Sequence, residues 1–214
     1  MNKFYIIFGL IGSVCFLVGD ILLGSVDSTP LEKRSHFYLT KGHGRTYDRK
    51  RIKITMTLAA VGVPFLYMGM AHIGDIADNS LWQQILSVLF ALTSIAWFII
   101  HINVALNVFV YSWADENVSG DRATKLSEET NKTFFHMLIP AYLVLAASFI
   151  AVMTSILLEK TTLPKFCVMF SPLVGAIVPA CVEKLLPQSK LRKIMETIQL
   201  NFGMIIWFVS LLFA

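Results

Sequence analysis

The chain has 214 residues, of which 56% are hydrophobic and only 15% are charged. A soluble domain of this size needs more polar surface, so the composition predicts one compact membrane domain with no sizeable extramembrane domain. The net charge of +4 would suit nucleic acid. However, the basic residues lie in short loops beside apolar segments, where they orient a membrane protein and attract anionic lipid. We therefore expect membrane lipids as partners and no nucleic acid.

Six apolar segments are long enough to cross a bilayer, which requires about 20 mostly apolar residues. They predict helices at residues 4–23, 52–73, 82–112, 132–158, 165–186 and 191–214. None shows the period-2 alternation of a transmembrane barrel. The expected fold is therefore all-α, with residues 1–214 forming a single bundle of six transmembrane helices.

Two of the segments that connect these helices can be interpreted from their charged and polar residues. Residues 121–132 contain oppositely charged pairs at i,i+4 spacing, which predicts a helical extension of the fourth helix into solvent. The segment from Ser25 to Lys50 is polar and mixed in charge, and we expect a poorly structured surface loop. Its Gly42-His43-Gly44 lacks the spacing of a phosphate-binding loop.

The distribution of Lys and Arg predicts the orientation. Eight lie between Lys33 and Lys53, three between Arg122 and Lys132, and four between Lys184 and Lys193. Only three of the 18, at positions 3, 160 and 165, lie on the opposite side. Because positively charged loops stay in the cytoplasm, both termini are expected outside a cell membrane, here taken as a bacterial plasma membrane.

With this orientation, nine polar or ionisable groups within the spans fall in the cytoplasmic half of the bilayer. They are Asp20, His101, Asn103, Asn107, His136, Glu183, Glu196, Gln199 and Asn201. Such groups are costly in a membrane and normally face a partner, water or the bundle interior. Glu183 and Glu196 lie near the interface and are interpreted as ordinary interfacial residues.

Asp20 is the most informative of these groups. With Gly9, Ser13 and Gly24 it forms a small, polar face at helical spacing, and small residues let a neighbouring helix approach closely. The face fits a packing seam in which Asp20 bonds to another helix. It fits equally a carboxylate that faces a cavity and acts as acid, base or cation partner.

The third predicted helix is polar on two faces. His101 follows Trp97 by one turn, whereas Asn103 and Asn107 form a second stripe about 200° away around the helix. His101 is either a hydrogen-bonded interior histidine or a proton-transfer group, since histidine titrates near neutral pH. His136 lies near the predicted cytoplasmic surface. At the opposite rim, His72 and Asp75 are expected to form a local hydrogen bond.

No metal or cofactor is expected. The chain lacks HxxxH, HExxH, GxSxG and GxGxxG patterns, and its three cysteines lie in apolar runs without a CxxC. The fifth predicted helix contains Pro172 and Pro179. Because proline frees backbone carbonyls in a membrane helix, we expect this helix to be kinked, and the kink either lines a cavity or only improves packing.

Several short motifs in the final third also carry a resemblance. They are Leu163-Pro164-Lys165, Phe170-Ser171-Pro172-Leu173, Leu185-Leu186-Pro187 and Leu200-Asn201-Phe202-Gly203. Together with Gly19-Asp20, they resemble a family of small bacterial multi-pass membrane proteins of unknown function. The resemblance implies that Asp20, Pro172 and Asn201 are important, and it implies no activity.

These observations lead to one functional hypothesis and two alternatives. The leading hypothesis is a protein that binds a lipophilic or amphipathic small molecule in a polar cavity of the cytoplasmic half. In that cavity Asp20 and His101 would handle a proton, and Trp97, Asn103, Asn107, His136 and Asn201 would contact the ligand. The alternatives are a proton-coupled secondary transporter and a structural or regulatory membrane subunit.

Overall fold

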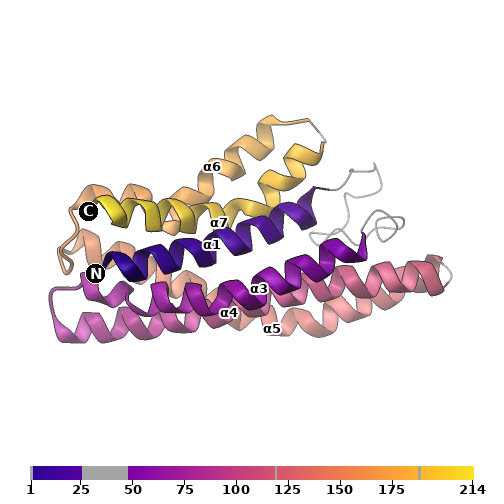
Figure 1. Ribbon diagram of the computed structural model, residues 1–214, viewed down its shortest axis with the longest axis horizontal. Coiled ribbons are helices and arrows are strands. Elements are labelled where there is room, and N and C mark those ends of the chain that lie inside the picture. Colours follow the sequence, from indigo (N-terminus) through magenta and orange to yellow (C-terminus); the bar gives the residue numbers. More distant parts are fainter. Residues whose placement is uncertain (1, 26–47, 119, 188) are drawn as a thin grey trace.

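The computed structural model describes residues 2–25, 48–118, 120–187 and 189–214, with the side chains of some residues between 111 and 134 left undescribed. These parts are helical apart from turns and one isolated bridge between Ala77 and Thr161. The predicted loop from Ser25 to Lys50 lies largely outside the described residues. The chain is an all-α membrane protein (Figure 1).

The long helices agree with the predicted spans and extend some of them. They are α1 (Lys3–Gly24), α3 (Arg49–Ala71), α4 (Ser80–Asn117), α5 (Gly120–Leu157) and α7 (Lys190–Phe213). All five contain a span long and apolar enough to cross a membrane. The predicted helical extension at residues 121–132 is confirmed, because α5 begins at Gly120.

The fifth predicted helix is broken into two pieces. A 3-10 helix, η3 (Lys165–Phe170), is followed by Ser171 in an extended conformation and then by the 14-residue α6 (Pro172–Leu185). A residue before proline is kept out of the helical region, so the chain cannot continue its helix through Ser171. The expected kink is therefore present as a complete break. Because α6 alone is too short to span, six uninterrupted transmembrane helices are not confirmed.

Both ends of the chain lie at the same end of the bundle (Figure 1). We call this the terminal end, where α1 begins and α7 ends, and the opposite end the loop end, where α1 ends and α3 begins. A short 3-10 helix, η2 (Ile73–Ile76), connects α3 to α4 at the terminal end. The helices follow each other in space in the order α5, α4, α3, α1, α7 and α6, and η3 also touches α5 and α7. At the loop end, α6 and α7 diverge from the other helices (Figure 1).

The turn that leads from α5 into η3 is fixed at Glu159. This residue has a φ of 56°, and the backbone N–H groups of Glu159 and Lys160 donate to the carbonyls of Ile156 and Ser155. The pattern is a Schellman ending of the helix. The ammonium of Lys165 donates to the Glu159 carboxylate at 2.6 Å and holds the pKa of Glu159 below its ordinary value.

Glycine residues bring α1 and α3 into backbone contact. A Cβ placed on Gly69 would overlap the Cα of Gly9, and one placed on Gly12 would overlap the backbone of Leu66. Gly9, Ser13 and Gly24 are all buried, so the predicted small-residue face of α1 is a packing surface. Such close approach is how membrane helices gain packing energy without a hydrophobic effect between them.

Gly69→Ala should therefore destabilise the bundle by about 1–3 kcal/mol, because α1 and α3 must separate to admit a methyl group. Gly19→Ala is the matched control, since the nearest atom to its Cβ would be the Thr55 methyl carbon at 3.3 Å, and the Thr55 backbone would lie 3.9 Å away. Unfolding midpoints in detergent measure both. Equal losses in the two variants would contradict backbone contact at Gly69.

Candidate functional site

Four of the predicted site residues meet in the bundle interior. Asp20 lies one turn before the end of α1, Trp97 and His101 lie on α4, and Asn201 lies in the first half of α7. His101 Nε2 is 3.2 Å from Asp20 Oδ1 and 3.0 Å from Asn201 Nδ2. Trp97, His101 and Asn201 are buried. Three helices far apart in sequence thus share one hydrogen-bond network, which we call the Asp20–His101 network.

Trp97 fixes the orientation of the Asn201 amide. The indole Nε1–H can only donate, and it lies 2.7 Å from Asn201 Oδ1. The Asn201 nitrogen must then face the other way, where it donates to Asp20 Oδ2 and lies next to His101 Nε2. The amide oxygen of Asn201 therefore bonds to α4, and its amide nitrogen contacts both α1 and α4.

The backbone fixes the tautomer of His101 in the same way. Its Nδ1 lies 2.8 Å from the carbonyl oxygen of Trp97, which can only accept, so Nδ1 carries a proton. Nε2 is left with a single bonding position and two candidate partners. One is an acceptor, Asp20 Oδ1, and the other is a donor, Asn201 Nδ2.

The partner that Nε2 takes depends on one proton. A neutral His101 accepts from Asn201 through the Nε2 lone pair. A protonated His101 instead donates from Nε2 to the Asp20 carboxylate, and the Asn201 N–H loses its acceptor. The two states differ by one proton and by whether His101 bonds to α7 or to α1. The geometry at Nε2 is therefore compatible with either protonation state of the imidazole.

The sequence did not identify all the neighbours of this network. The Phe16 ring packs against the His101 ring with 4.5 Å between centroids. Thr197 Oγ1 lies 3.3 Å from the backbone carbonyl oxygen of Asp20. Each precedes a site residue by four positions, Phe16 before Asp20 and Thr197 before Asn201, so helical spacing could have found them. Tyr142 on α5 lies within electrostatic range of Asp20, and no local pattern would have indicated it.

The remaining predicted ligand contacts lie elsewhere. Asn103 and Asn107 form a pair along α4, in which Asn107 Nδ2 donates to the Asn103 side chain at 2.9 Å. Asn107 Oδ1 is buried and has no hydrogen-bond partner among the described residues. His136 is exposed on α5. The predicted pair at the opposite rim is confirmed, with His72 Nδ1 3.3 Å from Asp75 Oδ2.

Metal-ligating groups are sparse in the part of the chain that the structure describes. Asp20 and His101 offer two potential metal ligands, and no group of three or more His, Cys, Asp or Glu residues that could hold a metal is found there. The polar groups of the network hydrogen-bond to one another instead.

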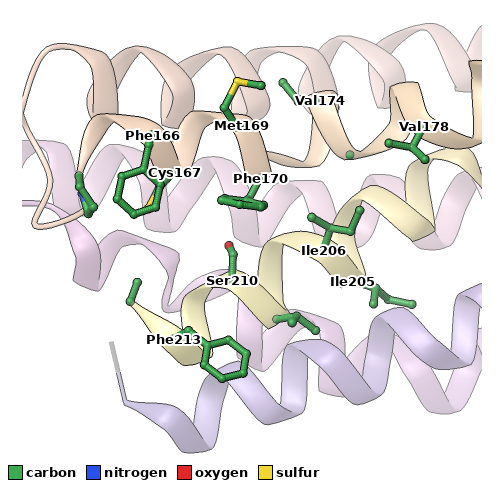
Figure 2. A pocket seen from close by; sticks show the side chains of 14 residues that line it. Phe166, Cys167, Met169, Phe170, Val174, Val178, Ile205, Ile206, Ser210 and Phe213 are labelled. Carbon is green, nitrogen blue, oxygen red and sulfur yellow. The ribbon is translucent and has the colours of Figure 1, made fainter.

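A cavity of about 800 Å³ lies in the other half of the bundle, between η3, α6 and α7 (Figure 2). The two pieces of the fifth predicted helix, η3 and α6, line it through residues such as Phe170, Val174 and Val178, which is one of the two roles that the prolines left open. None of its lining residues belongs to the Asp20–His101 network. The sequence had instead placed a polar cavity around that network.

Trp97→Phe should destabilise the protein by about 1–3 kcal/mol more than Trp207→Phe. Both indoles are fully buried and lose the same atoms, but only Trp97 Nε1 has a hydrogen-bond partner among the described residues. Removing Trp97 Nε1–H leaves the buried Asn201 Oδ1 without its donor. Detergent unfolding curves of the two variants test this, and equal losses would contradict the assigned Asn201 orientation.

Comparison with known proteins gives a family and no activity. No curated protein and no solved structure matches the chain. One family model matches residues 1–214, and its description is a family of unknown function. This agrees with the resemblance to an uncharacterised family noted in the sequence. Because the match covers the whole chain, the protein belongs to the family of unknown function DUF6796.

Proposed function

We propose that this membrane protein binds a lipophilic or amphipathic small molecule at the loop-end half of the bundle and exchanges a proton with it through Asp20 and His101. The observation that carries the proposal is the single bonding position of His101 Nε2, which faces an acceptor and a donor at once. Such a position can form a hydrogen bond whether or not Nε2 carries a proton, and acid–base chemistry requires both states.

The position of the pair supports this role. An ionisable group within a transmembrane bundle is expensive, and its retention points to function. The Asp20 and His101 side chains keep 13% and 10% of their surface exposed, so the pair is not sealed. Any molecule that approaches within the membrane passes lipid-facing helix surfaces, so lipophilic or amphipathic compounds have the readiest access.

Transport of a proton-coupled solute is less well supported. A transport path would have to continue from the network to the terminal end. In that half of α7, Met204, Trp207 and Phe208 are completely buried. Close-packed apolar side chains on this buried face of α7 leave no room there for a solute or for a chain of waters.

A purely structural role is the competing proposal, because Asp20 bonds directly to α4 and α7. A second His–Asp pair in the protein serves as a control for this alternative. The pair at the terminal end, His72 and Asp75, has the same residue types at 3.3 Å but is more exposed, and it links one helix end to the turn after it. Comparison of the two pairs separates proton handling from helix packing.

The first test is the protonation of His101, measured by ¹⁵N NMR on histidine-labelled protein in detergent. We expect Nδ1 to stay protonated while Nε2 gains a proton as the pH falls. Asp20→Asn should shift the Nε2 signal of the protonated form, because it removes the carboxylate acceptor that lies 3.2 Å from Nε2. Asp75→Asn should leave the His101 signals unchanged. An Nε2 that never titrates between pH 5 and 8, about the range in which histidine normally does, would rule out proton exchange.

The second test is retention of a ligand, measured by native mass spectrometry of detergent-purified protein with extraction of bound lipophiles. We expect wild type and Asp75→Asn to retain one defined species. Asp20→Asn should retain about tenfold less, the loss expected for a charge-assisted hydrogen bond. An unfolded Asp20→Asn variant would favour the structural role. A folded variant with unchanged bulk phospholipid would contradict ligand binding at this pair.

A further inference from the structure

We propose that the cavity between η3, α6 and α7 binds one hydrocarbon chain of a membrane lipid from the leaflet at the terminal end. This site is separate from the Asp20–His101 network, and the proposal does not depend on the function assigned to that network. It rests on the cavity's lining, its shape and the side to which it opens.

The lining side chains are apolar except for the Cys167 thiol and one hydroxyl. Phenylalanine, methionine, isoleucine and valine side chains dominate it (Figure 2). The hydroxyl belongs to Ser210, which donates to the backbone carbonyl oxygen of Trp207 at 2.7 Å and is therefore already satisfied. Water gains no hydrogen bonds in such a space, and apolar cavities accordingly stay dry. The occupant that these walls favour is a hydrocarbon.

The shape of the cavity suits a chain rather than a compact molecule. Its lining along α7 extends from Ile205 to Ala214. At the rise of an α-helix this is about 13 Å along the helix axis. Across from α7 lie η3 and α6, joined at the break before Pro172. The cavity is thus an elongated groove that runs along α7 toward the terminal end.

Glycine contacts hold α6 against α7 where both helices line the groove. A Cβ on Gly175 would come within 2.8 Å of the Gly203 Cα, and one on Gly203 would overlap the Pro172 carbonyl. The helices α6 and α7 therefore touch through their backbones at this point, and Gly175 is itself one of the lining residues. The lining continues along α6 to Val178 and, on the other side of the break, along η3.

The rim faces the membrane and not the aqueous phase. Phe166 and Met169 line the cavity and are 64% and 66% exposed, on an element that starts at the terminal end. A lipid chain can therefore enter sideways from its leaflet. A second copy of the protein is a weaker candidate, because the exposed apolar side chains are spread over every long helix and are not confined to the groove.

Photolabelling in vesicles tests the proposal. The full chain is reconstituted in phosphatidylcholine and phosphatidylglycerol that contain a trace of phosphatidylcholine with a mid-chain diazirine, and labelled residues are mapped by mass spectrometry. We expect residues of the cavity, such as Met169 and Val209, to be labelled about fivefold more than Val88 and Ile95. A fivefold preference of the lipid chain for the cavity corresponds to about 1 kcal/mol. Val88 and Ile95 are well-exposed apolar residues of α4 outside the cavity.

A matched pair of variants on α6 identifies the occupied volume. Val178 lines the cavity and Ile177 does not, although the two are adjacent and are 51% and 52% exposed. Val178→Trp fills the groove and should abolish the preferential labelling, whereas Ile177→Trp should preserve it. Equal labelling of the cavity and of α4, or equal effects of the two variants, would overturn the proposal. Protection of the cavity that grows with protein density would also overturn it, by indicating a second copy.

Discussion

The amide of Asn201 is the contact on which the interior of this bundle depends. Within a membrane no water completes the hydrogen bonds of a buried polar group, so each must be satisfied by the protein itself. Asn201 accepts from Trp97 and donates toward Asp20 and His101, and it thereby joins α7 to α1 and α4 through one side chain. The same network leaves His101 Nε2 with one bonding position between two partners, which is the basis of the proposed proton exchange.

The packing of α1 positions this network. The helix has backbone contact with α3 through Gly9 and Gly12, and its Gly24 lies against Thr197 and the Lys193 backbone of α7. A larger side chain at these contacts would move α1 as a rigid body and carry Asp20 with it. The packing hypothesis and the acid–base hypothesis for the small-residue face are therefore not exclusive. The face that packs α1 is also the face that carries the carboxylate.

Helix α7 is common to the two features of the bundle. In its first half Asn201 points into the polar network, and from Ile205 onward another face of the helix lines the apolar cavity. The elements η3 and α6 form the opposite wall of that cavity. The bundle thus has a polar, titratable interior toward the loop end and a lateral apolar groove toward the terminal end. The two use different faces of one helix, so they can act independently.

Sequence alone determined the membrane fold, five of the spans and the identity of the central polar residues. Each follows from local properties, namely the length of an apolar run and the cost of an Asp or His within it. Sequence could not show that Asp20, Trp97, His101 and Asn201 meet, while Asn103, Asn107 and His136 lie apart, because that depends on which helices are neighbours. The sequence also predicted one continuous helix where η3 and α6 are separate, because hydropathy does not reflect the backbone restriction that Pro172 places on Ser171. The cavity was decided by tertiary structure as well, because its walls come from three elements, of which α6 and α7 meet through backbone contact at Gly175 and Gly203.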